Sequence, residues 1–113
     1  MKEIKAIIHP HMISKVVSAL RTLEHFPGFT VLDARGQGRG RGVSGAYVVT
    51  EDDIDYHRKV VMVVVCSDEI VPTITETIRN AAHTGRKGDG IIIVGEITEV
   101  IRIRTGEQND LAV

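Results

Sequence analysis

The chain is poor in cysteine and aromatic residues: among 113 residues it has one cysteine, no tryptophan, two tyrosines and two phenylalanines. The lone Cys66 cannot form an internal disulfide, which favours a reducing, cytoplasmic location. No apolar run approaches the roughly 20 residues that a membrane helix requires, so the sequence predicts no membrane insertion. The formal net charge of −1 points to no strongly charged partner.

Length and composition suit one folded domain over residues 1–113. Apolar residues make up 42% of the chain and charged residues 26%, as in ordinary globular proteins. Alternating and helically spaced apolar residues predict six elements. These are strands at about 2–8, from Phe29, at 60–66 and at Ile91–Arg104, with Gly95 as a bulge or close-approach point, and helices at about 12–24 and 68–82.

The predicted order is strand, helix, strand, strand, helix, strand, which is the ferredoxin-like βαββαβ arrangement, an α/β fold of the α+β sandwich type. The helices would cover one face of the sheet. The nearly uniformly apolar run Val60–Cys66 would leave apolar side chains on the other face. A domain this small covers such a face by association, so we expect an oligomer.

The connection between the second and third strands, about residues 36–58, is far longer than the loops of compact domains. Its first part, Arg35–Gly45, is rich in glycine and arginine, and each glycine widens the freedom of the backbone. Its second half is acidic. Two interpretations stay open from the residues alone: a solvated insert, or a flexible arm that orders when a partner protein binds.

The segment Thr84–Gly90, between the second helix and the last strand, contains three glycines and the cations Arg86 and Lys87. Such a segment can cradle an anion with backbone N–H groups and side chains, or it can simply end the helix. Arg102 and Arg104 would lie on one face of the last strand. Two guanidinium groups placed so can hold a di- or triphosphate, or they can merely face solvent.

Three segments together resemble the P-II nitrogen-regulatory signalling family: Thr84–Gly90, Val100–Glu107 and the glycine-rich opening Arg35–Arg39. The resemblance runs from Met1 to the acidic tail beyond Thr105. It implies a non-enzymatic regulator, a homotrimer that binds ATP or ADP in clefts between neighbouring subunits. It further implies that the long arm contacts a partner protein, such as a membrane transporter or an enzyme of nitrogen metabolism.

The resemblance also assigns roles to particular residues. Lys59 matches a lysine that helps to hold the effector 2-oxoglutarate in the family, whereas Gly40 replaces a glutamine that organises the associated magnesium ion. Ile91 replaces a phosphate-binding lysine, and Asp52 stands where many members have a modifiable tyrosine. The matching positions, with the rest of the glycine-rich segment, make up the candidate nucleotide site: Gly38, Arg39, Thr84, Gly85, Arg86, Lys87, Gly88, Asp89, Gly90, Arg102 and Arg104.

Histidines provide the main alternative, a metal-associated regulator of related fold. His9 and His11 could bind a divalent transition metal together with His25, His57 or His83. No nucleophile–base pair is evident from the spacing of residues, so we expect no enzymatic activity. A nucleic-acid partner is disfavoured, because no aromatic residues separate the arginines of the arm.

Overall fold

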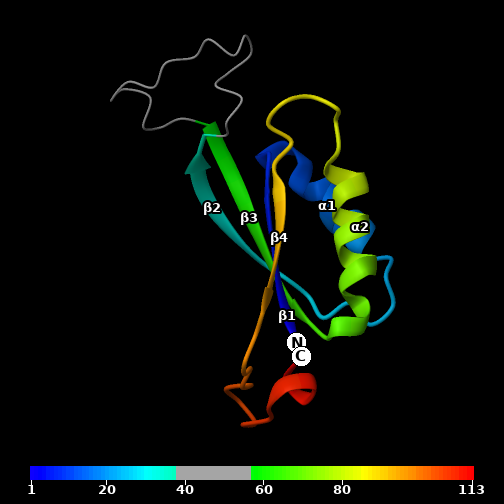
Figure 1. Ribbon diagram of the computed structural model, residues 1–113, viewed down its shortest axis with the longest axis vertical. Coiled ribbons are helices and arrows are strands. Elements are labelled where there is room, and N and C mark those ends of the chain that lie inside the picture. Colours follow the sequence, from blue (N-terminus) through cyan, green and yellow to red (C-terminus); the bar gives the residue numbers. More distant parts are fainter. Residues whose placement is uncertain (38–56) are drawn as a thin grey trace.

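The computed structural model describes residues 1–37 and 57–113 (Figure 1). The strands are β1 (Lys2–Ile8), β2 (Thr30–Gly36), β3 (His57–Cys66) and β4 (Ile91–Glu96). The helices are α1 (Ile13–Leu20) and α2 (Val71–Ala82), each preceded by a short 3₁₀ turn, and another 3₁₀ turn, Asn109–Ala112, lies near the C-terminus. Within the described residues, neither helix is long and apolar enough to cross a membrane.

The strands form one antiparallel sheet in the order β2-β3-β1-β4. β1 is central, and its Ile4 lies opposite Val64 of β3 and Val94 of β4. Both helices pack on the same face of the sheet, as Figure 1 shows. This arrangement confirms the predicted ferredoxin-like fold.

The core lies between the sheet and the two helices, because alternate residues of the central strands point toward the helices. A spacing of four residues puts Val16 with Leu20, and Ile74 with Ile78, on one face of α1 and α2 respectively. Burial of each large apolar side chain contributes ~1.5–3 kcal/mol. The core consists of Ile4, Ala6, Ile8, Val16, Leu20, Met62, Val64, Cys66, Ile74, Ile78, Ala81 and Ala82.

The opposite face of the sheet, hereafter the open face, carries no helix in the described part of the chain. On β3, Val61 and Val63 point to this face and are half-buried. On β4, Ile91 and Ile93 do the same and are exposed. The pairing of β2 with β3 adds Leu32, which is also exposed. The open face is therefore apolar along β3 and β4, as the sequence predicts, whereas β1 contributes the ion pair of Glu3 and Lys5 between them.

The first helix and the arm differ from their predicted bounds. α1 ends at Leu20 rather than near residue 24, because the chain turns there and the Leu23 N–H donates to the Leu20 carbonyl. The arm is narrower than 36–58, since Gly36 pairs with His57 and both belong to the sheet. Its central residues, 38–56, lie outside the described part of the chain.

The last strand is much shorter than predicted. β4 ends at Glu96 rather than at Arg104, because its partner β1 begins at Lys2, directly opposite Glu96. Beyond this point the sheet offers no strand to pair with. Gly95 forms no bulge: it pairs in register with Glu3, and a Cβ atom there would meet nothing within 4 Å.

Gly90 joins the segment after α2 to β4 where the backbone of β1 passes close by. Its φ of +109° disfavours other residues, and a Cβ atom would lie 1.8 Å from the Ile7 carbonyl oxygen. We predict that Gly90→Ala lowers the free energy of unfolding by about 3 kcal/mol, from overpacking and backbone strain together. Urea denaturation at matched protein concentration measures this loss.

Gly95→Ala is the matched control, because the space around Gly95 is open and its φ is not left-handed. This variant should change the free energy of unfolding by less than about 1 kcal/mol. If both variants unfold at the same urea concentration, the close approach at Gly90 does not govern stability.

Candidate nucleotide site

The segment Thr84–Gly90, hereafter the glycine loop, is folded around the carboxylate of Asp89. The Thr84 hydroxyl donates to Asp89 Oδ1, and the Thr84 and Gly85 backbone N–H groups donate to Oδ2 at 2.8 and 3.1 Å. The Arg86 N–H donates to the Thr84 hydroxyl oxygen at 3.1 Å. Gly85 and Gly88 have positive φ, which allows so tight a curve. The loop is thus held in shape by its own acid.

The carboxyl group of Asp89 is consequently more acidic than that of an ordinary aspartate. The hydrogen bond from the Thr84 hydroxyl, followed by that from its backbone N–H, lowers the pKa of Asp89 to about 2. The His83 Nδ1 atom lies 3.5 Å from Asp89 Oδ2 and adds a favourable interaction when protonated. Two backbone donors of the loop therefore serve Asp89, and the exposed side chains of Arg86 and Lys87 are its cationic groups toward solvent.

Lys59 ties the glycine loop to the sheet. Its ammonium donates to the Gly88 carbonyl at 3.0 Å, and the residue is only 9% exposed. Burial lowers the pKa of Lys59, and the nearby Asp89 partly opposes this. His9 lies beside Gly88 as well: its Nε2 atom is 3.3 Å, and the Lys59 Nζ atom 3.8 Å, from the position of a Cβ atom there. Burial, followed by the charge of Lys59, lowers the pKa of His9.

Lys59 is also close in sequence to the arm, because β3 starts at His57, directly after residues 38–56. The Lys59–Gly88 hydrogen bond therefore links the glycine loop to the point where the arm enters the sheet. Gly38 and Arg39, two further candidates for the nucleotide site, lie outside the described residues.

Arg102 and Arg104 lie on a turn and not on a strand, so the prediction that alternation puts them on one strand face is wrong. The hairpin Ile101–Gln108, hereafter the C-terminal hairpin, is closed by two backbone hydrogen bonds of 2.8 Å, from Arg102 N–H to Glu107 O and from Gly106 N–H to Arg102 O. The guanidinium of Arg102 donates through Nε to the Ala112 carbonyl at 3.3 Å. Its Nη1 atom lies 3.7 Å from Glu107 Oε1, which holds the side chain near the hairpin.

The two halves of the candidate site are far apart within one chain. Figure 1 shows the glycine loop (yellow) and the C-terminal hairpin (orange to red) at opposite ends of the longest axis of the molecule. The structure brings the glycine loop together with Lys59 and His9. It does not bring Arg102 or Arg104 of the same chain to them. One chain alone cannot present both sets of cations to one polyphosphate.

A small hollow that the sequence did not predict lies beside the glycine loop, between α2 and β4. This α2–β4 hollow has a volume of about 320 Å³. Its lining is mostly apolar, with Asp89 and His83 among its few polar residues. It is lined by Ile8, Ile78, Arg79, Ala82, His83, Asp89, Gly90, Ile91 and Ile92.

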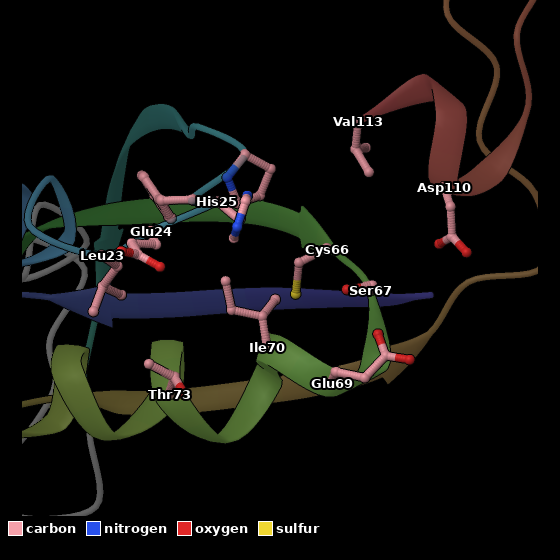
Figure 2. A pocket seen from close by; sticks show the side chains of 12 residues that line it. Leu23, Glu24, His25, Cys66, Ser67, Glu69, Ile70, Thr73, Asp110 and Val113 are labelled. Atoms are coloured by element: carbon pink, nitrogen blue, oxygen red, sulfur yellow. The ribbon is translucent and has the colours of Figure 1, made fainter.

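A larger cavity of about 910 Å³ lies at the opposite end, between the α1–β2 connection, the start of α2 and the C-terminus (Figure 2). Cys66 and Ile70 line it from one side, and Asp110 lines it from the C-terminal turn. None of the candidate nucleotide residues contributes to it. Its charged residues Glu24, Glu69 and Asp110 are acidic, so it does not suit a polyphosphate.

The structure gives no support to the metal site. His9 and His11 stack with ring centroids 5.2 Å apart. His83 lies beside Asp89, whereas His25 lines the cavity at the other end of the molecule. Across residues 1–37 and 57–113, no group of three or more histidine, cysteine, aspartate or glutamate residues is placed to hold a metal ion.

The Thr84 hydroxyl is the group on which the acidity of Asp89 depends most. We predict that Thr84→Val raises the pKa of Asp89 from about 2 toward the ordinary 3.8, and that Thr84→Ser keeps it low. A ¹³C NMR titration of the aspartate carboxyl groups measures both. Since the folded pKa is depressed, Asp89 stabilises the fold above pH 3.8 and loses this effect as the pH falls toward 2.

The valine variant should accordingly lose less stability than the natural protein between pH 4 and pH 2. An unchanged Asp89 titration in Thr84→Val would show that the hydroxyl does not organise the loop.

Comparison with known proteins identifies the family of the chain. The profile of the family described as Nitrogen regulatory protein P-II matches residues 1–107. Nitrogen regulatory protein P-II of Rhizobium meliloti is 47% identical over 107 residues, which is 95% of each chain. The P-II protein of Azospirillum brasilense is 43% identical, and P-II 1 of Escherichia coli K12 is 42% identical, each over 113 residues and the full length of both chains. The chain belongs to the P-II family of nitrogen regulatory proteins, and it is a signalling regulator rather than an enzyme.

Proposed function

We propose that the protein is a homotrimer that binds ATP or ADP between neighbouring subunits and thereby controls a partner protein in the cytoplasm. The observation that carries this proposal is the separation of the glycine loop from the C-terminal hairpin in one chain. Each element alone has only two exposed or half-exposed cations. A neighbouring copy that supplies its hairpin to the loop completes a site with four cations: Arg86, Lys87, Arg102 and Arg104.

Electrostatics explain why such a site needs a ligand. Four cationic side chains brought together repel one another, and a di- or triphosphate placed among them removes this repulsion. Arginine is well suited to the task, because its planar guanidinium can bind two phosphate oxygens at once. The acidic cavity at the other end of the chain offers no comparable attraction.

Symmetry constrains how the copies are arranged. Rotation within a closed ring leaves the height of every atom along the ring axis unchanged. A hairpin can therefore meet the loop of the next subunit only if both stand at a similar height. Loop and hairpin lie at opposite ends of the long axis of the chain (Figure 1). This long axis must therefore lie roughly perpendicular to the symmetry axis of the ring. The apolar open face supports association, since a ring can bury it.

Lys59 provides a route from the nucleotide to the arm. Its hydrogen bond to Gly88 joins the glycine loop to the first residues of β3, where the arm ends. A ligand that moves the loop, or an anionic effector that competes for the Lys59 ammonium, would alter this link. We therefore assign the arm between β2 and β3 to contact with a membrane transporter or a metabolic enzyme.

The proposal predicts nucleotide binding that depends on the hairpin. Isothermal titration calorimetry should detect ATP or ADP binding to the assembled protein. Loss of one charge-assisted contact costs ~1.5–3 kcal/mol, so Arg102→Ala should weaken binding about 10- to 150-fold. Arg104→Ala should have a similar effect and tests the phosphate contact more cleanly, because Arg104 lies exposed whereas Arg102 also contacts Ala112 within its own chain.

Arg21→Ala is the control: Arg21 is exposed at the end of α1, so its substitution removes the same charge at a site away from the loop and the hairpin. It should leave the affinity within about twofold of the natural value. Absence of heat with millimolar ATP and ADP, from protein shown by light scattering to be a trimer, would refute nucleotide binding.

A further inference from the structure

The tip of the C-terminal hairpin presents an apolar side chain to solvent. Ile103, between Arg102 and Arg104, is 100% exposed. Tight turns are usually occupied by polar residues and glycine, and transfer of an isoleucine out of water is favourable by ~1.5–3 kcal/mol. An isoleucine so exposed, at the element that the proposed assembly delivers to another subunit, indicates a contact with that subunit.

The α2–β4 hollow has the properties required to receive this side chain. Its volume of about 320 Å³ exceeds that of an isoleucine side chain, and its walls include Ile8, Ile78 and Ile92. At its edge, Ile91 is 59% exposed although it begins a strand. Asp89 contributes the only carboxylate of the lining. The hollow is thus mostly apolar, and its polar residues are one acid, Asp89, together with Arg79 and His83.

In the proposed assembly the hairpin lies beside the hollow, because the hollow and the glycine loop share residues. Asp89 and Gly90 belong both to the glycine loop and to the lining of the hollow. Neighbouring residues are about 3.8 Å apart along the backbone, so a hairpin that brings Arg102 and Arg104 to the loop brings Ile103 to the same place. We propose that Ile103 of one subunit packs into the α2–β4 hollow of the next, against Ile92, whose side chain faces the helices. This inference rests on the intersubunit site of the proposed function.

The contact of Ile103 with the hollow would allow subunits to associate when no nucleotide is bound. Without a nucleotide, the arginines of the hairpin are repelled by Arg86 and Lys87 of the neighbouring loop. Burial of Ile103 opposes this repulsion because it does not depend on charge. A second copy of the chain is favoured over a nucleotide base as the occupant, since the hairpin provides a fully exposed aliphatic side chain that matches the isoleucine walls.

Disulfide trapping tests the contact directly. The double variant Ile92→Cys with Ile103→Cys should form dimers and trimers on a non-reducing gel after mild oxidation, because a disulfide requires Cβ atoms within about 4.5 Å. Each single variant should stay monomeric on the gel, as Cys66 is buried and cannot contribute. Ile92→Cys with Leu111→Cys is the matched control: Leu111 is 70% exposed near the same hairpin but is not its tip. This pair should not crosslink.

A second measurement does not require a disulfide. Without nucleotide, Ile103→Asp should raise the concentration at which the trimer dissociates at least about tenfold, because it removes apolar burial. Ile103→Leu should leave it nearly unchanged. Trimers that bind ATP but show neither the crosslink nor the effect of Ile103→Asp would overturn the contact and leave the proposed function intact. Natural protein that neither associates nor binds nucleotide would overturn the proposed function itself.

Discussion

The sheet holds the glycine loop and the C-terminal hairpin at opposite ends of the chain, and the proposed function depends on this separation. The loop cannot swing toward its own hairpin, because Gly90 is pressed against the Ile7 carbonyl and Lys59 binds the Gly88 carbonyl. β4 links the two elements, and its ladder with β1 keeps them apart. Any site that uses both sets of cations must therefore be assembled from different subunits.

Internal hydrogen bonds fix the conformation of the glycine loop in the absence of a ligand. Asp89 gathers the Thr84 hydroxyl and two backbone N–H groups, which fixes the curve of the loop and keeps its carboxylate ionised. The loop thus carries a negative charge at its centre and two exposed cations at its surface. Lys59 then joins this shaped element to the start of β3, so a change at the loop has a direct path to the strand that follows the arm.

Sequence patterns predicted the elements of the fold well, because alternation and helical spacing report which side chains meet the core. They failed where the outcome depends on a partner far along the chain. Apolar residues continue beyond Glu96, but β4 stops there because β1 begins at Lys2, opposite Glu96, and only the Ile97 N–H still pairs, with the Met1 carbonyl. For the same reason Arg102 and Arg104 belong to a turn. The α2–β4 hollow is lined by Ile8 and Ile78, which come together only in the folded chain, so the sequence pattern did not predict it.

The candidate site was predicted in part for a similar reason. Glycine spacing marked the loop and paired arginines marked the hairpin, but a linear pattern does not show that the two lie at opposite ends of the molecule. Nor does a linear pattern show that Thr84 holds the loop through Asp89 and that Lys59 holds it through the Gly88 carbonyl, because both hydrogen bonds form only in the folded chain. What the structure adds is therefore the separation of loop and hairpin, for which the proposed function requires a second subunit.

Mixing of two defective variants tests this requirement most directly. One variant, Arg86→Ala with Lys87→Ala, lacks the cations of the loop, and the other, Arg102→Ala with Arg104→Ala, lacks those of the hairpin. Each alone should bind ATP weakly. Refolded together at equal amounts, they should recover about a quarter of the natural number of high-affinity sites, since random assembly pairs an intact loop with an intact hairpin at that frequency. No recovery, from mixed trimers verified by native mass spectrometry, would contradict a site shared between subunits.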